Sequence, residues 1–221
     1  MVVVDVQRDF LDPTMPAKVG SWEKAFCVPG VRALLESARE RGWPVVHVGT
    51  RHLDHSTLPF HHRMKGIELY TVEDTRGSDF VVPPAAGETI MFKQWYSAFD
   101  APLEDHVDED TRIIWAGVAS DCCIQQSAFE ADRRKIHSLV PYQAVSASSP
   151  SAYVGSLVAM AKSACDVVDL ADVIGRSGAG APSLDTPAIE ERAEAWYQEQ
   201  AARLGEPGSL GLDDVVERLA R

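Results

Sequence analysis

The alternation of short apolar segments with segments of helical spacing constrains the fold of this chain more than any other feature. Val2-Val3-Val4 is a β-branched run that predicts a strand, and residues 31–41 place apolar side chains on one face of a helix that ends before Gly42. Further strands are predicted at residues 45–48, 89–92, 112–116, 136–140 and 166–170, and further helices at residues 125–133 and 151–163. Such alternation predicts a three-layer α/β/α fold, with helices on both faces of a mostly parallel central sheet of about six strands.

A change in composition divides the chain into two parts. The alternating pattern ends near residue 175, and the glycine-rich residues 175–184 have the composition of a linker. Two helical stretches follow, at about residues 186–204 and 212–221. We therefore expect one α/β domain over residues 1–175, and a linker with a C-terminal helical extension over residues 176–221. The extension is too small for a core of its own, so it is expected to pack on the domain or on a second subunit.

Charge and hydropathy limit the partners of the protein. The 221-residue chain carries a formal net charge of −12, which argues against nucleic acid because phosphate binding needs a basic face. No apolar run is long enough to span a bilayer, and Met1 leads directly into the first predicted strand, so we expect a cytoplasmic protein without a membrane partner. The four cysteines do not form a disulfide framework, and Cys27 and Cys165 are expected to be small buried side chains.

Three reactive side chains follow three of the predicted strands. Asp5, Lys93 and Cys123 each lie at or just beyond the carboxyl end of an apolar run. In open parallel sheets the functional sites form at this edge, so the three side chains are expected to meet there. They supply a general base, a cation and a soft nucleophile, which are the groups needed for covalent hydrolysis of an amide-like bond.

Cys123 follows a Gly-Val-Ala-Ser turn between a predicted strand and a predicted helix, for which Asp121 is a candidate cap. Free backbone N–H groups at a helix start lower the pKa of a thiol and stabilise an oxyanion. The alternative is an ordinary buried core cysteine. Cys122 is rotated by about 100° from its neighbour, so both thiols cannot face one site, and the spacing from the strand slightly favours Cys123.

The two charged residues of the trio have structural alternatives. A carboxylate at the position of Asp5 is a base, a metal ligand or a cap, and the residue alone does not decide between them. Lys93 lies between Phe92 and Trp95, where a partly desolvated ammonium needs a charge partner, and Asp5 is the natural one. Asp9 is expected to hold or cap the following loop.

Residues 51–80 are polar and irregular, as in a long active-site loop. The loop contains four histidines, which are His52, His55, His61 and His62. With Asp54 they suggest a metal site, but no pair has the H-x-x-x-H spacing of a helix, and histidine is equally an acid–base group. Arg51 and Arg63 are alternatives for binding a substrate carboxylate.

The three reactive segments resemble the isochorismatase-like cysteine hydrolase superfamily, which includes nicotinamidases, N-carbamoylsarcosine amidases, ureidoacrylate amidohydrolases and biuret hydrolases. The N-terminus matches the family pattern D-x-Q-x-D-F, the segment from Lys93 matches K-x-x-x-S-A-F, and the segment from Gly117 matches G-V-x-T-D-x-C-V. Ser120 and Ile124 are conservative departures from the last pattern. The resemblance covers roughly residues 1–175.

The resemblance implies roles for individual residues. Asp5 would be the general base, Lys93 the ammonium that lowers the thiol pKa, and Cys123 the nucleophile that forms a thioester. The family has a cis peptide in the turn, here between Val118 and Ala119. The N–H groups of Ala119 and Cys123 would form the oxyanion hole.

Departures from the family pattern concern the metal and the substrate. Nicotinamidases carry a D-x-H metal motif, whereas this chain has Arg51-His52-Leu53-Asp54-His55, so we expect no metal and no other cofactor. The chain also has Gln143-Ala144 where the family often has Asp-Ala after a strand. The residues expected to bind substrate are Phe10, Arg51, His52, Trp95 and Tyr96.

The leading hypothesis is a hydrolase that cleaves a C–N bond of a small amide, ureide or lactam through an Asp-Lys-Cys triad. One alternative is an isochorismatase-type vinyl-ether hydrolase, which needs an acid rather than a thiol. The other is a non-catalytic binding or scaffold protein of the same fold. The resemblance further implies a homodimer or homotetramer whose only other partner is a small-molecule substrate.

Overall fold

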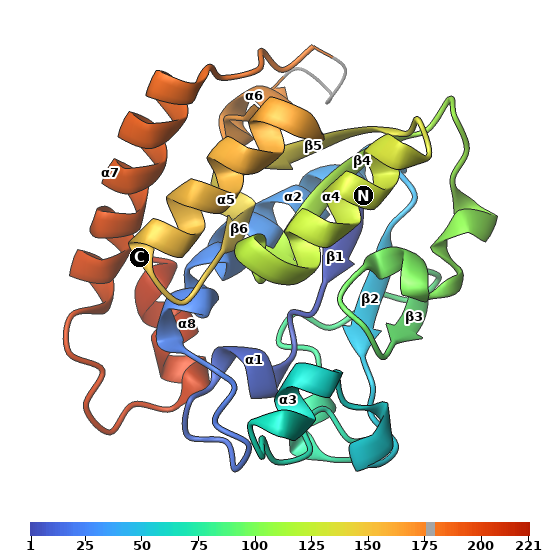
Figure 1. Cartoon of the computed structure of the whole chain (residues 1–221). Coiled ribbons are helices and arrows are strands. Elements are labelled where there is room, and N and C mark those ends of the chain that lie inside the picture. The colour runs from blue at the N-terminus through green and yellow to red at the C-terminus, as the bar shows by residue number, and fades with distance from the viewer. Residues whose placement is uncertain (176–179) are drawn as a thin grey trace.

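The computed structural model describes residues 1–175 and 180–221 and has a central parallel sheet (Figure 1). Six strands lie in the order β3-β2-β1-β4-β5-β7, and every pairing among them is parallel. Their bounds are β1 Val2–Val4, β2 Val46–Thr50, β3 Thr89–Lys93, β4 Arg112–Val118, β5 His137–Pro141 and β7 Asp166–Val168. The two-residue strand β6, Val145–Ser146, pairs with β4. The predicted α/β class and the mostly parallel sheet of about six strands are confirmed.

Helices cover both faces of the sheet. In Figure 1, α4 and α5 lie in front of the sheet and α2 lies behind it. The described helices are α1 Arg8–Leu11, α2 Val28–Glu40, α3 Phe60–Met64, α4 Gln125–Arg133, α5 Pro150–Ser163, α6 Leu170–Gly175, α7 Thr186–Leu204 and α8 Leu212–Leu219. The predicted amphipathic segment at residues 31–41 corresponds to α2, whose apolar face is buried against the sheet.

The central strand β1 brings the site residues together. Val4 pairs with Val48 of β2 on one side and with Gly117 of β4 on the other, so all three strands end at the same level. Gly117 has a φ of +115°, and a Cβ at this position would lie 2.0 Å from the carbonyl oxygen of Val4. Only glycine therefore allows β4 to approach β1 this closely, just before the turn that carries Cys123.

The C-terminal helices pack on the domain of the same chain. Helix α7 lies along α5, and α8 contacts both α2 and the 3-10 turn Trp22–Cys27 (Figure 1). Tyr197 of α7 is buried, and its ring lies 5.1 Å from the ring of Phe26. Of the predicted linker at 175–184, residues 176–179 lie outside the described residues.

Some local predictions need correction. Asp121 does not cap the helix, because the helix begins with a π turn, Ser120–Ile124, whose flanking residue is Ala119; Asp121 lies inside that turn. The last predicted strand ends at Val168, and the chain turns into α6 at Leu170. In the part of the chain that the structure describes, no helix combines the length and the apolar character that a membrane span requires.

Candidate active site

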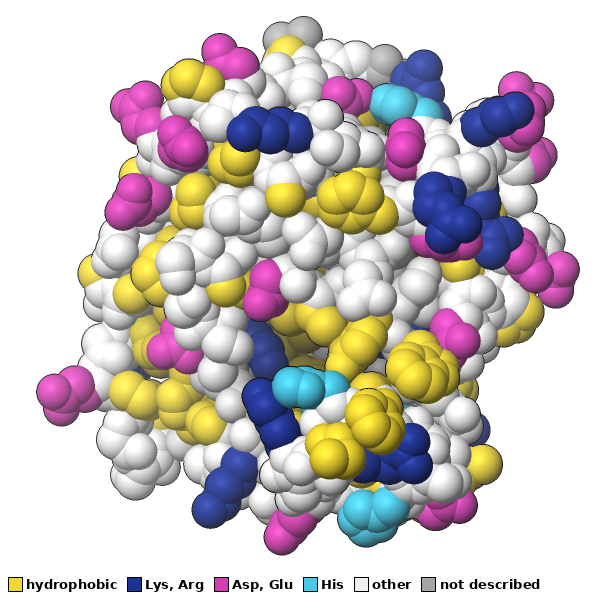
Figure 2. Space-filling view, viewed as in Figure 1, with side chains coloured by type: hydrophobic (Ala, Val, Ile, Leu, Met, Phe, Trp, Pro, Cys, Tyr) yellow, Lys and Arg dark blue, Asp and Glu magenta, His cyan; other side chains and the backbone are white. Residues whose placement is uncertain are grey.

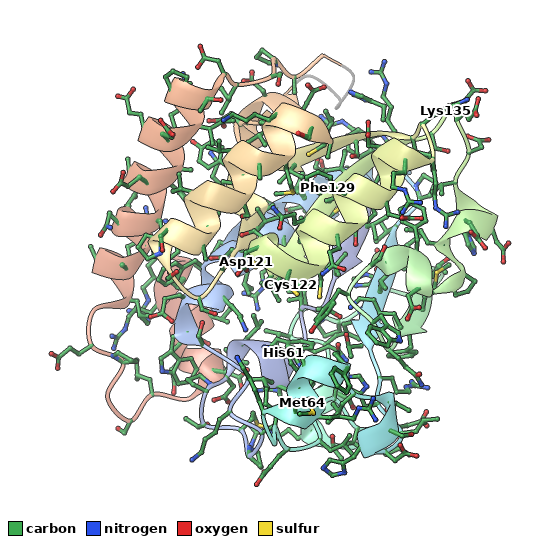
Figure 3. The ribbon with its side chains drawn as sticks, viewed as in Figure 1. His61, Met64, Asp121, Cys122, Phe129 and Lys135 are labelled. Carbon is green, nitrogen blue, oxygen red and sulfur yellow. The ribbon has the colours of Figure 1, made fainter. Side chains whose placement is uncertain are left out.

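A cavity of about 300 Å³ opens at the carboxyl ends of β1, β2, β3 and β4. Asp5, Lys93 and Cys123, the three reactive residues predicted from the sequence, all line it. Figure 2 shows the hollow on one face of the molecule, with Lys or Arg, His and hydrophobic side chains around it. Cys122 and Asp121 lie at the start of the α4 segment, with His61 and Met64 of α3 on the other side of the hollow (Figure 3). The topology therefore places the predicted trio in one concave site.

Asp5 and Lys93 form a buried ion pair. The Lys93 Nζ donates to Oδ2 of Asp5 at 2.7 Å, and the two residues are 2% and 1% exposed. Thr50 bridges the pair, because its Oγ1 donates to Oδ1 of Asp5 at 2.9 Å and accepts from Nζ at 3.0 Å. The carbonyl oxygen of Trp95 accepts a further bond from Nζ at 3.0 Å. The ammonium is thus held in one position by three oxygen atoms.

Lys93 also contacts the thiol of Cys123. Its Nζ lies 3.5 Å from the sulfur, so one ammonium touches both the carboxylate and the candidate nucleophile. Burial alone lowers the pKa of Lys93, but the charges of Asp5 and Cys123 raise it above its usual value. Lys93 therefore stays charged, as an electrostatic role at this position requires.

The thiol of Cys123 is buried and hydrogen-bonded to the neighbouring thiol of Cys122. Its hydrogen bond with the Cys122 thiol and its burial raise the pKa of Cys123 well above the usual value, and they outweigh the opposing charge of Lys93. The charge of Lys93 acts in the expected direction and lowers the pKa of Cys123, while the charge of Asp5 adds to the increase. The lowered thiol pKa expected from the turn stays a prediction.

The D-x-Q-x-D-F segment has a structural role beyond Asp5. The side-chain amide of Gln7 accepts from the Thr50 N–H at 2.8 Å and donates to the Thr50 carbonyl at 3.1 Å, which fixes the end of β2 beside β1. Asp9 accepts from the backbone N–H of Thr71 at 2.6 Å. Asp9 therefore holds the loop, as expected, while burial raises its pKa.

The K-x-x-x-S-A-F segment connects Lys93 to the helix that carries Cys123. Ser97 caps a 3-10 turn by accepting from the Phe99 N–H, and the N–H of Ala98 donates to Ser127 Oγ of α4 at 2.8 Å. Ser127 Oγ in turn donates to the carbonyl oxygen of Cys123 at 2.6 Å. These hydrogen bonds connect the segment that follows Lys93 to the backbone of Cys123.

The turn after β4 matches the geometry that the resemblance implies. The peptide bond between Val118 and Ala119 is cis. Ala119 and Cys123 both line the cavity, as an oxyanion hole formed by their N–H groups requires. Their catalytic roles remain predictions.

Three of the five expected substrate-binding residues reach the cavity. Phe10, Trp95 and Tyr96 line it, whereas Arg51 and His52 do not. Arg51 instead forms an ion pair with Glu73 at 2.7 Å, and its guanidinium lies over the ring of Phe92. His52 is fully buried with its ring against Tyr70, and burial lowers its pKa to about 4.

The remaining histidines do not assemble a metal site. His55 and His61 are exposed, while His62 reaches the cavity and its Nδ1 lies 2.8 Å from the hydroxyl of Tyr70. Within residues 1–175 and 180–221, no three histidine, cysteine, aspartate or glutamate side chains are grouped so as to share a metal ion. The donor set of this chain therefore does not fit the metal motif of nicotinamidases.

Sequence reasoning missed Thr50, Lys24 and the pair of His62 and Tyr70. Thr50 ends β2 beside Asp5, so the strand-end argument could have found it. Lys24 lies in the Trp22–Cys27 turn, which has no catalytic motif, yet its side chain lines the cavity. No local signal identifies it, because its position depends on how the N-terminal loop folds over the sheet.

The fold and the site define an α/β protein with a parallel central sheet and a cysteine in a cavity at the carboxyl ends of its strands. The model of the Isochorismatase domain family matches residues 1–172, so the chain belongs to the isochorismatase family of hydrolases. No curated protein matches the chain.

Solved structures agree with this assignment. An isochorismatase family protein from Desulfovibrio vulgaris is 27% identical, with a TM-score of 0.68 over 80% of this chain and 96% of that chain. The pyrazinamidase of Pyrococcus horikoshii, solved in complex with zinc, is 24% identical, with a TM-score of 0.64 over 76% of this chain and 97% of that chain. The N-carbamoylsarcosine amidase from Thermoplasma acidophilum is 23% identical, with a TM-score of 0.60 over 74% and 92%. The last two similarities show the shared fold alone.

Proposed function

We propose that the protein is a cysteine-dependent hydrolase that cleaves a C–N bond of a small amide, ureide or lactam. One observation carries this proposal: on the wall of the cavity, the ammonium of Lys93 contacts both the carboxylate of Asp5 and the sulfur of Cys123. A carboxylate, a fixed cation and a thiol in this arrangement are suited to a covalent acyl-transfer reaction.

In the proposed reaction, Asp5 removes the proton of Cys123, and the thiolate attacks the substrate carbonyl carbon. The N–H groups of Ala119 and Cys123 stabilise the oxyanion of the tetrahedral intermediate. The C–N bond then breaks, and the leaving nitrogen takes the proton from the Asp5 carboxyl group. Asp5, again ionised, removes a proton from water as the water oxygen attacks the thioester carbon. The C–S bond then breaks, the sulfur takes the proton back from Asp5, and the carboxylic acid leaves.

The geometry of the site supports this order of events. Asp5 and the thiol of Cys123 lie beside the same ammonium, which makes the carboxylate the natural base for the thiol proton. A vinyl-ether hydrolase would need an acid and gives no role to the thiol. A binding protein gains nothing from a costly buried ion pair beside a cysteine.

Trapping the thioester tests the proposal. Acid quenching during turnover of a panel of small amides and ureides should leave an acyl adduct on Cys123, located by intact mass and peptide mapping. Cys123→Ala should abolish both adduct and turnover. Cys122→Ser is the matched control, because it changes the adjacent thiol and should still form the adduct. Turnover that persists in Cys123→Ala, or an adduct on Cys122 alone, contradicts the proposal.

A further inference from the structure

Lys24 is a second ammonium on the wall of the active-site cavity. It lies in the 3-10 turn Trp22–Cys27, and its Nζ donates to the carbonyl oxygen of Val19 at 2.8 Å. That bond leaves two of its three N–H donors for other partners. Nothing in the triad chemistry uses this residue.

Among residues 1–175 and 180–221, no carboxylate forms an ion pair with Lys24. Burial lowers the pKa of Lys24, and the charge of Asp121 only partly offsets this effect. The other lysine of the cavity, Lys93, is already paired with Asp5. Arg51, the cation first considered for a substrate carboxylate, is paired with Glu73 outside the cavity wall. Burial also lowers the pKa of His62, so this ring does not supply a positive charge at neutral pH.

Asp121, the acidic group whose charge acts most strongly on Lys24, forms no ion pair with it. Asp121 also lines the cavity, but it is exposed at the start of the α4 segment (Figure 3) and makes no ion pair with Lys24. A partly buried ammonium without an ion-pair partner is stabilised by an anion that enters the same space. The cavity is small, about 300 Å³, so this anion and the scissile group must belong to one small molecule.

We propose that Lys24 is a specificity-determining residue that binds a carboxylate of the substrate. This inference rests on the proposed function and makes it more specific: the substrate is a small amide or ureide that carries a carboxylate near its reacting carbonyl. The rings of Phe10, Tyr70 and Tyr96 line the same cavity and would enclose the apolar part of such a molecule.

Protection of Cys123 from alkylation tests the inference without a turnover assay. The probes are malonamate, succinamate and ureidoacetate, each compared with the neutral carboxamide that replaces its carboxylate. The measurement is the probe concentration that halves the rate of Cys123 labelling by iodoacetamide, read by peptide mapping. At least one carboxylate should protect at about 10- to 100-fold lower concentration than its carboxamide, as expected for a hydrogen bond to a charged group.

Three variants separate charge from structure. Lys24→Gln keeps a donor for the Val19 carbonyl but removes the charge, so it should abolish the preference for the carboxylate. Lys24→Arg keeps the charge and should retain part of the preference. Lys18→Gln is the matched control, because Lys18 is an exposed lysine of the same loop outside the cavity wall, and it should retain the full preference.

The outcomes distinguish this inference from the proposed function. It is overturned if no carboxylate protects better than its carboxamide, or if Lys24→Gln leaves the preference intact. If the preference for carboxylates depends on Lys24 but no thioester forms on Cys123, the result supports the anion site and contradicts the hydrolase mechanism. If neutral amides form the thioester and no preference depends on Lys24, the result supports the mechanism and contradicts the anion site.

Discussion

At the scale of single residues, the Asp5–Lys93 pair is the most costly element of the site. Two charges that are almost fully buried lose their hydration, and their attraction offsets this loss only because Thr50 and the Trp95 carbonyl complete the hydrogen bonding. A functional role explains why the chain retains such a pair next to Cys123, where apolar side chains would pack at lower cost.

A double-mutant cycle on Asp5 and Lys93 tests the role of the pair in stability and its role in catalysis. Lys93→Met leaves a buried carboxylate without its partner, so the free energy of unfolding should fall by about 3–5 kcal/mol. Asp5→Asn with Lys93→Met removes both charges and should recover most of that loss. The single variants Lys93→Met and Asp5→Asn and the double variant should each lose at least about 100-fold in turnover, since the cation, the base or both are absent. Urea unfolding and steady-state kinetics measure the two effects, and a double variant that regains activity would argue against the triad.

At the scale of secondary-structure elements, the close approach of β1 and β4 positions the candidate nucleophile. Gly117 allows this approach because a side chain at its position would overlap the Val4 carbonyl. The turn that follows then brings Ala119 and Cys123 to the cavity beside the end of β1.

Gly117→Ala should therefore be strongly destabilising. The added Cβ would lie 2.0 Å from the Val4 carbonyl oxygen at a φ of +115°, so we expect a loss of at least about 3 kcal/mol or failure to fold. Gly155→Ala is the control, because this helix position in α5 has no atom within 4 Å of a new Cβ, and alanine there should stabilise by about 0.5–1 kcal/mol. Thermal and urea unfolding compare the two. Equal stabilities of the variants would show that the close approach is not required.

At the scale of the whole molecule, the C-terminal helices support the N-terminal segment that carries Lys24. Helix α8 contacts the Trp22–Cys27 turn, and Arg8 of α1 pairs with Asp213 of α8 at 2.9 Å. Tyr197 of α7 packs on Phe26 of the same turn. The extension thus forms part of the core and stabilises one wall of the cavity from behind.

Tyr197→Ala should test this support. The side chain is 3% exposed, so its removal should lower the free energy of unfolding by about 3–5 kcal/mol. Tyr197→Phe loses only a long hydrogen bond of 3.4 Å to the Ala147 carbonyl and should cost no more than about 1 kcal/mol. Urea unfolding of both variants gives the comparison. A small loss for Tyr197→Ala would mean that the extension is a loosely attached appendage.

The sequence by itself determined the sheet and the meeting of Asp5, Lys93 and Cys123. Strand and helix periodicity are local properties, and strands of a parallel sheet end at one edge, so residues at their ends must meet. The role of Asp9 in holding the following loop was likewise predicted, because aspartate commonly accepts hydrogen bonds from backbone N–H groups of loops.

Only the tertiary structure decided which other residues face the cavity. Arg51 lies away from it because Glu73, distant in the chain, forms its ion pair, and His52 is buried against Tyr70. Lys24 reaches the cavity because the loop before it folds over the sheet and the Val19 carbonyl holds its ammonium. A strand is specified by the pattern of its own residues. The direction of a side chain in the loop beyond the strand depends on contacts with distant residues, which no local pattern specifies.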